Sequence, residues 1–265
     1  MAGDYVVSAH DHPRGFPLDA RGRQAGLTRP ARVARGLLGA ALALLALGLL
    51  GSANDASATT LLDYVTFDGI DYIRWADEPG RPLTRGDRGP EFAVVECSFG
   101  EDTRGCPYGV DAAAAFLPSG TRVYVVRGYP TNFRLAAVWQ DRIFLYQAWR
   151  NPRAKVGGDL YDIVGKVRAV DVRRGEPPLA AATKPAPITS SPDVAALVEM
   201  IVTGAVRAPQ AHAVAEPCYW LTLWLTDGTT LGRLYFRETS ELMGGVNVPG
   251  EFARILERYL GPRSD

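Results

Sequence analysis

The sequence predicts an α+β protein: a mainly antiparallel β domain, built as a small sandwich, roll or barrel, followed by a C-terminal helix–hairpin–helix unit. Three observations predict this fold class. Stretches of alternating apolar and polar residues recur between residues 59 and 174, and turn sequences separate them about every ten residues, as in antiparallel sheets. A proline-rich stretch follows at 175–190. Between residues 191 and 262, two helical patterns flank a hairpin signal.

The N-terminal residues indicate export. Residues 1–35 contain six arginines, and the positive-inside tendency places such a basic arm in the cytoplasm. Residues 36–54 carry no charge, and a helix of this length just crosses a hydrocarbon core of about 30 Å. We therefore expect a membrane partner through this transmembrane or signal segment, with the following region extracytoplasmic at the cell membrane. Small residues at 56–58 leave open cleavage near Ala58 and secretion.

The first exported domain, residues 59–174, is expected to consist of short strands. Residues 62–75 should form a hairpin around Asp68-Gly69, a sequence typical of two-residue turns. A loop rich in glycine, proline and charge follows at 77–90. Further strands are expected at 91–99, 114–117, 122–126, 133–139 and 143–149, with 162–173 as the last strand of this domain.

The cysteines fit an oxidising location. Eight residues lie between Cys97 and Cys106, in a polar stretch that contains glycine. We predict a disulfide between them, because exported proteins keep such bonds. Two unlinked thiols are the alternative. Cys218 begins an apolar run and is expected to be a small buried hydrophobe.

The C-terminal part begins with a break in regular structure. Residues 175–192 contain five prolines, which resist both helix and sheet, so we expect a linker at 175–190. Ser191-Pro192-Asp193 then gives a helix start, and the helix should run to about Val206. Strands at 218–226 and 229–237 flank Asp227-Gly228, and a short helix should run from Pro249 to Leu260.

Composition excludes several kinds of chemistry. Lysine plus arginine equals aspartate plus glutamate at 29 each, so no overall charge favours nucleic acid as a partner. Outside the basic arm the sequence has a single histidine, His212, which argues against a histidine-activated nucleophile and against histidine-rich metal sites. No phosphate-binding glycine motif is present. We expect no cofactor and no metal. Acidic pairs at 101/102, 159/162 and 238/241 leave carboxylate chemistry open.

Aromatic residues of the C-terminal hairpin are the predicted binding residues. Strand alternation places Trp220 and Trp224 on one face and the leucines of the same strand on the other. The leucine face should pack against the helices. The tryptophan face, with Tyr235 of the second strand, could then bind a sugar ring, a peptide or a partner chain. The alternative is that Trp220 and Trp224 pack against the β domain.

The runs at 120–124, 128–129 and 133–136, together with the hairpin around Asp68-Gly69, resemble uncharacterised bacterial secreted or membrane-anchored proteins. This resemblance implies no activity and no functional residue. The function we expect is that of a non-catalytic extracytoplasmic domain that binds an envelope protein or a glycan. Two alternatives stay open: a carboxylate-dependent hydrolase of envelope polymer, which requires two facing acids, and a structural or assembly factor.

Overall fold

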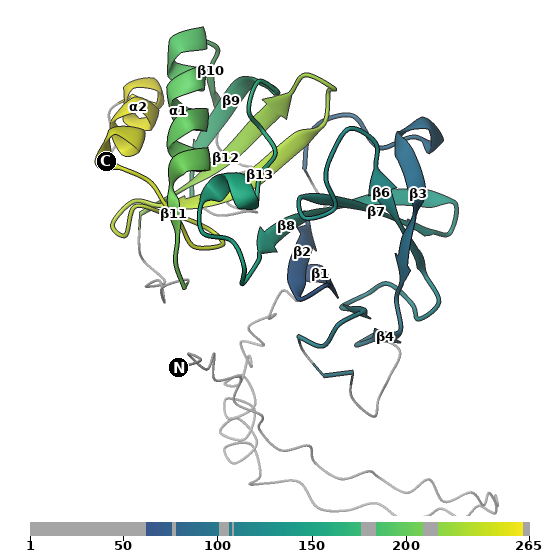
Figure 1. Cartoon of the computed structure of the whole chain (residues 1–265). Coiled ribbons are helices and arrows are strands. Elements are labelled where there is room, and N and C mark those ends of the chain that lie inside the picture. Colours follow the sequence, from purple (N-terminus) through teal and green to yellow (C-terminus); the bar gives the residue numbers. More distant parts are fainter. Residues whose placement is uncertain are drawn as a thin grey trace, which may run out of the picture. The chain divides into compact units, whose positions relative to one another are not determined.

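The computed structural model describes residues 62–75, 78–100, 106–107, 109–175, 184–208 and 217–261. Of these residues 42% lie in strands and 17% in helices, so the folded part is mostly β (Figure 1). The predicted transmembrane or signal segment at 36–54 and the acidic pair at 101/102 lie outside the described residues, as does His212. None of the helices in the described ranges is both long enough and apolar enough to cross a membrane.

The first sheet has eight strands and curves into a half-barrel. Its strand order is β3-β6-β7-β8-β2-β1-β5-β4, and every pair is antiparallel except β4 with β5. The strands are β1 (Asp63–Phe67), β2 (Ile70–Arg74), β3 (Arg88–Val94), β4 (Cys97–Ser98), β5 (Ala113–Ala114), β6 (Arg122–Val126), β7 (Arg134–Trp139) and β8 (Arg142–Arg150). Two short 3-10 helices, η1 (Arg85–Asp87) and η2 (Gly157–Asp159), lie in its connections.

The predicted hairpin of β1 and β2 is confirmed. Asp68 and Gly69 both have positive φ, at 55° and 66°, as a two-residue turn matched to the twist of a hairpin requires. Gln140 and Asp141 make the equivalent turn between β7 and β8, with φ of 49° and 58°. Both turns fix the register of their strands, and the second brings Trp139 opposite Arg142.

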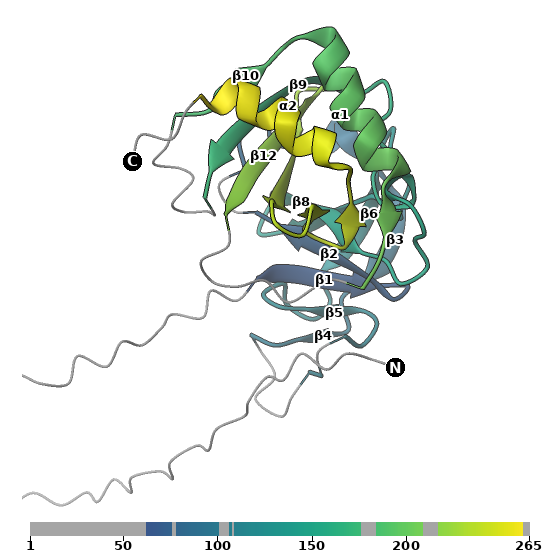
Figure 2. The same cartoon turned by 90° about the vertical axis from the view of Figure 1, so that its left-hand side faces the viewer.

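The second sheet has seven strands in the order β10-β9-β12-β13-β14-β15-β11. They are β9 (Val167–Arg174), β10 (Ala186–Ile188), β11 (Ala205–Val206), β12 (Cys218–Leu225), β13 (Thr230–Phe236), β14 (Glu241–Leu242) and β15 (Val246–Asn247). The helices α1 (Ser191–Thr203) and α2 (Gly250–Leu260) both pack against this sheet, and Figure 2 shows them side by side across its outer face.

The predicted α+β class with a C-terminal helix–hairpin–helix unit is wrong. The β12–β13 hairpin exists, but it lies in the middle of the seven-stranded sheet and does not form a unit with α1 and α2 alone. β9, expected to close the first domain, pairs along the length of β12 instead. Strand alternation predicts that a segment is extended without stating which strand it pairs with, so this long-range pairing escaped prediction.

Part of the expected linker is also a strand. Residues 186–188 form β10 and pair with β9. β10 is the outermost strand of its sheet, and proline is tolerated there because only one edge of the strand has a neighbour to bond. Pro187 therefore does not prevent the pairing.

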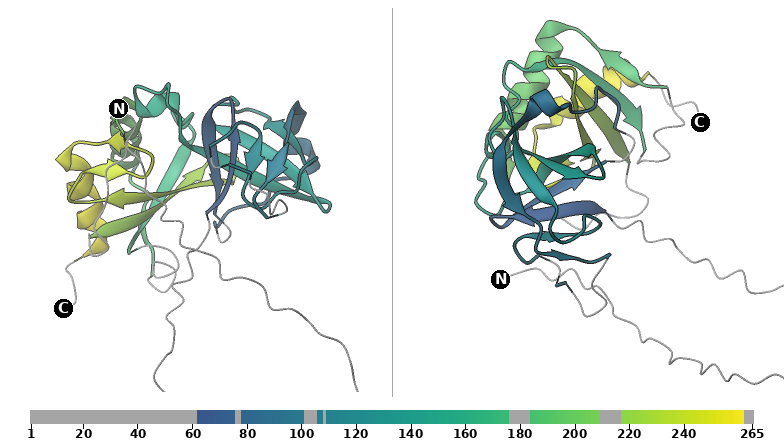
Figure 3. Two further views of the ribbon diagram at one scale, coloured as in Figure 1. Left: turned by 90° about the horizontal axis from the view of Figure 1, so that it is seen from below. Right: turned by 90° about the vertical axis from the view of Figure 1, so that its right-hand side faces the viewer.

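A single apolar core joins the two sheets. Side chains from both sheets and both helices belong to one cluster of buried residues, and residues 59–265 form one compact unit. The rings of Phe133 and Tyr161 meet edge to face where the sheets meet, with their centres 6.3 Å apart. Tyr235 packs on Phe252 of α2 at 5.0 Å. Figure 3 shows the half-barrel on one side of this junction and the helix-covered sheet on the other.

The predicted disulfide is confirmed. Cys97 of β4 and Cys106 are bonded, with Cα atoms 5.7 Å apart, inside the range of roughly 4.4–6.8 Å that disulfides require. The bond ties the end of the first sheet to the following loop, and Cys106 is buried. Cys218 is half-buried at the start of β12.

Candidate functional site

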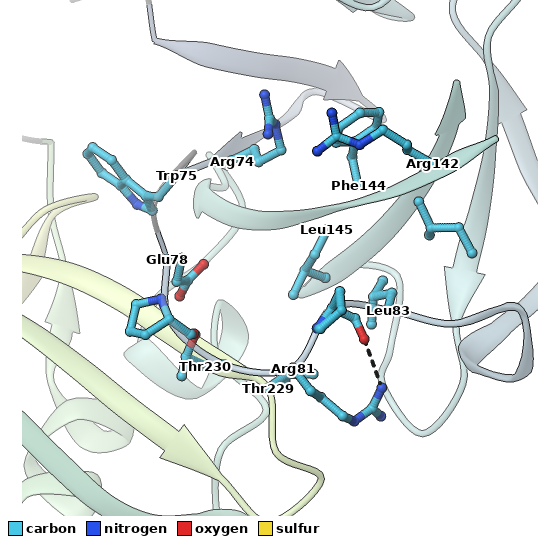
Figure 4. Close-up of a pocket in the computed structure, with 14 residues that line it drawn as sticks. Arg74, Trp75, Glu78, Arg81, Leu83, Arg142, Phe144, Leu145, Thr229 and Thr230 are labelled. Carbon is cyan, nitrogen blue, oxygen red and sulfur yellow. Dashed lines mark hydrogen bonds between the residues drawn. The ribbon is translucent and has the colours of Figure 1, made fainter. Parts of the chain in front are cut away.

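A cavity of about 200 Å³ lies where the two sheets meet. One wall is the segment 78–83, here called the strap, which follows β2 and leads to η1. The other walls come from β8 and from residues 229–230 at the start of β13 (Figure 4). We call this space the strap cavity. It is lined by Arg74, Trp75, Glu78, Pro79, Gly80, Arg81, Pro82, Leu83, Arg142, Ile143, Phe144, Leu145, Thr229 and Thr230.

Arg81 fixes the strap to the turn between β12 and β13. Its Nε donates to the Asp227 carbonyl at 2.6 Å, and its two Nη atoms donate to the Asp87 carboxylate at 2.8 and 2.7 Å. The guanidinium holds the pKa of Asp87 well below its usual range. Gly80 has φ +120°, and a Cβ atom there would lie 3.2 Å from the Gly228 carbonyl, so the close approach of strap and turn needs glycine.

Glu78 is the only carboxylate among the described residues that line the cavity. Figure 4 shows its carboxyl group pointing into the space between the strap and Leu145. Its Oε1 is buried and accepts no hydrogen bond from the described residues. Burial raises the pKa of Glu78 to about 7, against the opposing effect of the Arg233 and Arg134 guanidinium groups and of hydrogen bonds from Gly232 and Thr230. The carboxyl group therefore changes charge near neutral pH.

Two buried arginines lie behind the cavity. Arg134 of β7 is fully buried and donates to the Thr229 hydroxyl and the Thr230 carbonyl, each at 2.7 Å. Arg233 of β13 is also buried, and it donates to the carbonyls of Gly232 and Ala148 at 2.6 Å. Burial lowers the pKa of Arg134. Because the bonds to Thr229, Thr230 and Ala148 run from one sheet to the other, the arginines hold the sheets together at the base of the site.

Asp227 belongs to the same network. It accepts hydrogen bonds from the Thr229 amide and hydroxyl at 2.8 and 2.7 Å, and from the Tyr129 hydroxyl at 2.8 Å. Burial alone would raise the pKa of Asp227, but the hydrogen bonds from Thr229 and Tyr129 outweigh it and lower this pKa. The Arg134 guanidinium lies over the Tyr129 ring at 4.5 Å. Asp227 is thus an ionised carboxylate whose two oxygens already accept hydrogen bonds from other residues of the protein.

The rim of the cavity is rich in arginine. Strand alternation places Phe144 and Leu145 on opposite faces of β8, as Figure 4 shows. The guanidinium groups of Arg74 and Arg142 lie 4.8 and 5.1 Å from the centre of the Phe144 ring. Arg74 is paired with Asp63 at 2.5 Å. Arg142 is exposed and has no ion pair with any described residue.

Comparisons of the chain with protein-family models, with curated proteins and with solved structures find no match. The chemistry of the site is therefore inferred from its own geometry. This geometry offers one carboxyl group that titrates near pH 7, several guanidinium groups and an apolar wall. Such a set can bind and orient a polar group by charge and hydrogen bonds.

Of the three predicted binding residues, Trp220 and Trp224 share one face of β12, whereas Tyr235 lies on the other face of the sheet. Trp220 is buried and its ring meets Trp75, next to the first sheet, at 4.8 Å. Trp224 is half-buried, and its indole N–H donates to Asp171 at 2.8 Å. Tyr235 lies opposite Tyr219 and is buried on the other face, toward α2. A binding role for the three stays a prediction.

Trp220 nevertheless lies near the strap cavity. A Cβ atom at Gly232 would be 2.5 Å from Trp220 Cζ2 and 3.4 Å from Glu78 Oε1. The absence of a side chain at Gly232 therefore lets the indole and the carboxyl group approach the same point of β13. Sequence alternation pointed to Trp220, whereas nothing in the local sequence distinguished Glu78 from the other acids of its loop.

Of the acidic pairs considered in the sequence, Asp159 and Asp162 have another role. Asp159 accepts the amide hydrogens of Lys155 and Val156 at 2.8 and 3.1 Å, and these bonds lower its pKa. Asp162 forms an ion pair with Lys166. Asp159 and Asp162 thus stabilise a turn and do not line the strap cavity.

Proposed function

We propose that the protein is a non-catalytic, extracytoplasmic binding domain of the bacterial cell envelope, and that its ligand enters the strap cavity. The observation that carries this proposal is the Glu78 carboxyl group, whose Oε1 is buried, whose pKa is raised to about 7 and which faces a cavity at the junction of two sheets. Burying an ionisable group in this way costs folding stability, and such groups concentrate at functional sites.

The lining supports binding more than hydrolysis. A hydrolase with two carboxylates needs a second acid facing the first, at about 5 to 10 Å. Of the described residues that line the cavity, Glu78 is the sole acid, and the others are arginines, threonines and apolar residues. The cavity is also smaller than the roughly 300–1,000 Å³ typical of sites for whole small molecules. It suits one polar group of a larger envelope glycan or protein.

The extracytoplasmic location is supported by the Cys97–Cys106 disulfide, because such bonds persist in oxidising compartments. The basic arm and the uncharged segment at 36–54 support it independently.

The test uses the full-length protein isolated from a bacterial host. Intact mass of the membrane and soluble fractions, before and after reduction, shows whether the protein is anchored and oxidised. The purified protein is then incubated with solubilised envelope glycan fragments, and binding is measured by thermal shift while mass spectrometry follows the fragments. We expect fragments that bind and keep their mass.

Two variants assign the binding to the cavity. Leu83→Trp fills it from the strap and should abolish the thermal shift, because an indole ring occupies much of 200 Å³. Val164→Trp adds the same ring at an exposed position outside the cavity and should leave the shift unchanged. Cleaved fragments, a reduced protein in the cell, or equal binding by Leu83→Trp would each refute the proposal.

A further inference from the structure

The interior behind the strap cavity holds positive charge that is balanced only at a distance. Arg134 donates to a hydroxyl and a carbonyl, and Arg233 donates to two carbonyls and to the Tyr161 hydroxyl at 3.1 Å. All of these acceptors are neutral. In a low-dielectric interior such charges need a carboxylate nearby, or their burial is strongly unfavourable.

Two carboxylates near the strap cavity, Asp227 and Glu78, act on these guanidinium groups. Asp227 acts on Arg134, but its oxygens already accept hydrogen bonds from Thr229 and Tyr129. Glu78 interacts electrostatically with both arginines. Hydrogen bonds from Gly232 and Thr230 favour its ionised form, but its Oε1 accepts no hydrogen bond from the described residues. The negative charge of Glu78 is therefore only partly solvated, and an external anion could replace it.

We propose that the strap cavity binds the anionic group of its ligand, a carboxylate, sulfate or phosphate, together with one proton that Glu78 takes from solvent. This inference rests on the proposed function. A protonated Glu78 would donate a hydrogen bond to the anion, and the anion would take over the role of counterion to the buried arginines. For a singly charged anion such as a carboxylate, the net charge of the site would then be the same before and after binding.

The charged and titratable groups around Glu78 favour an anion over a cation. They come from every element that packs against the cavity. Strands β2, β7, β8 and β13 supply Arg74, Arg134, Arg142 and Arg233, and the strap and η1 supply Arg81 and Asp87. The connecting segments supply Tyr129, Tyr161 and Asp227. Arg81 and Asp87 neutralise one another, as do Arg74 and Asp63. In the remainder Arg134, Arg142 and Arg233 outnumber the two acids, so an ammonium ligand would meet net repulsion.

The two ligand charges predict opposite pH dependences. If an anion binds with a proton, its dissociation constant must rise with pH, approaching tenfold per pH unit above the pKa of Glu78 in the free protein. A cation that pairs with ionised Glu78 would instead bind more tightly as pH rises. The sign of the slope therefore decides the question without knowledge of the natural ligand.

The experiment is isothermal titration of the full-length protein with sulfate and with acetate, neither of which titrates between about pH 5.5 and 8.5. Ionic strength is held constant, and each pH is measured in two buffers of different ionisation enthalpy so that proton uptake is read directly. We expect weaker binding at pH 8.5 than at pH 6.5, by at least about tenfold, with uptake of up to one proton per anion near neutral pH.

Variants locate the proton. Glu78→Gln mimics the protonated carboxyl group and should bind the anions with an affinity independent of pH and without proton uptake. Glu251→Gln makes the same change on the exposed side of α2 and should behave like the unmodified protein. Proton uptake by the unmodified protein is informative even if Glu78→Gln does not fold.

A pH-independent affinity, a slope of opposite sign, or the absence of anion binding while glycan fragments still bind would overturn this inference and leave the proposed function standing. Loss of all ligand binding would overturn both.

Discussion

At the scale of single residues, the site depends on how burial and charge oppose each other at Glu78. Removal from water disfavours the carboxylate, while Arg233 and Arg134 favour it, and burial prevails because the pKa rises to about 7. At Asp227 the balance is reversed by direct hydrogen bonds from Thr229 and Tyr129. Two acids in one network thus have different charges near neutral pH for reasons visible in their contacts.

The raised pKa of Glu78 predicts how stability varies with pH. Between its ordinary pKa of 4.5 and about 7, the folded protein binds a proton that the unfolded chain does not. The contribution of Glu78 to the free energy of unfolding therefore falls as pH rises through this window and stays low above it. Glu78→Gln cannot titrate. Relative to the unmodified protein, we expect this variant to gain about 2.5 kcal/mol between pH 5 and pH 8, measured by denaturant unfolding.

Glu251→Gln controls for the general effect of removing an acid and should show no such pH-dependent gain. If the difference between Glu78→Gln and the unmodified protein were constant over this range, Glu78 would have an ordinary pKa in the folded state. The argument for a proton-linked site would then lose its basis.

Sequence reasoning reached some of these residues and missed others for a physical reason. Cys97 and Cys106 were paired correctly, because a short polar loop between cysteines constrains where they can go. Strand alternation pointed to Trp220, which is buried against Trp75, and its binding role stays a prediction. Glu78 and Arg134 could not be found, because segments from distant parts of the chain bury them. The residues next to them in the sequence show no pattern that predicts this burial.

At the scale of elements, prediction succeeded where the structure is determined locally. The β1–β2 and β12–β13 hairpins follow from Asp-Gly turns, and the start of α1 follows from Ser191 and Pro192. Failures concern pairing between distant segments. β9 was extended as expected, yet its neighbours are β10 and β12. The two-residue strands β14 and β15 are too short to show any alternation.

The contact between η2 and the end of α1 shows how tightly elements are fitted. Gly157 donates its amide hydrogen to the Gly204 carbonyl at 2.8 Å. A Cβ atom on Gly157 would lie 1.9 Å from the Ile201 carbonyl oxygen, whereas one on Gly158 would lie 3.3 Å from that of Val202. We expect Gly157→Ala to lower the free energy of unfolding by about 2 to 3 kcal/mol or more, because the helix must shift.

Gly158→Ala is the matched control, since it adds the same methyl group one residue away. It should lower the free energy of unfolding by less than about 1 kcal/mol. Denaturant unfolding at one pH compares the two variants. Equal effects would mean that η2 and α1 are not held at this distance in solution, and that the loss reflects glycine replacement alone.

At the scale of the whole molecule, the two sheets share one core and a buried polar junction. Arg134 of the first sheet bonds to Thr229 and Thr230, and Arg233 of the second sheet bonds to Ala148 of the first. The strap adds a further link through Arg81. A ligand in the strap cavity would touch both sheets, so its affinity depends on the sheets keeping their relative position.

This shared junction predicts that both sheets unfold in one step. In hydrogen exchange of the full-length protein, the slowest amides of β7 and of β12 should report the same free energy of opening, because neither sheet keeps its core alone. Arg134→Met lies in the first sheet, yet it should lower the value for both strands equally, by roughly 3 kcal/mol, since it removes charged hydrogen bonds and leaves buried acceptors. Val164→Ala, at an exposed position, should change neither. A fall confined to β7 would show two independent domains, and a cavity between independent domains would have no fixed shape with which to hold an anion against Glu78.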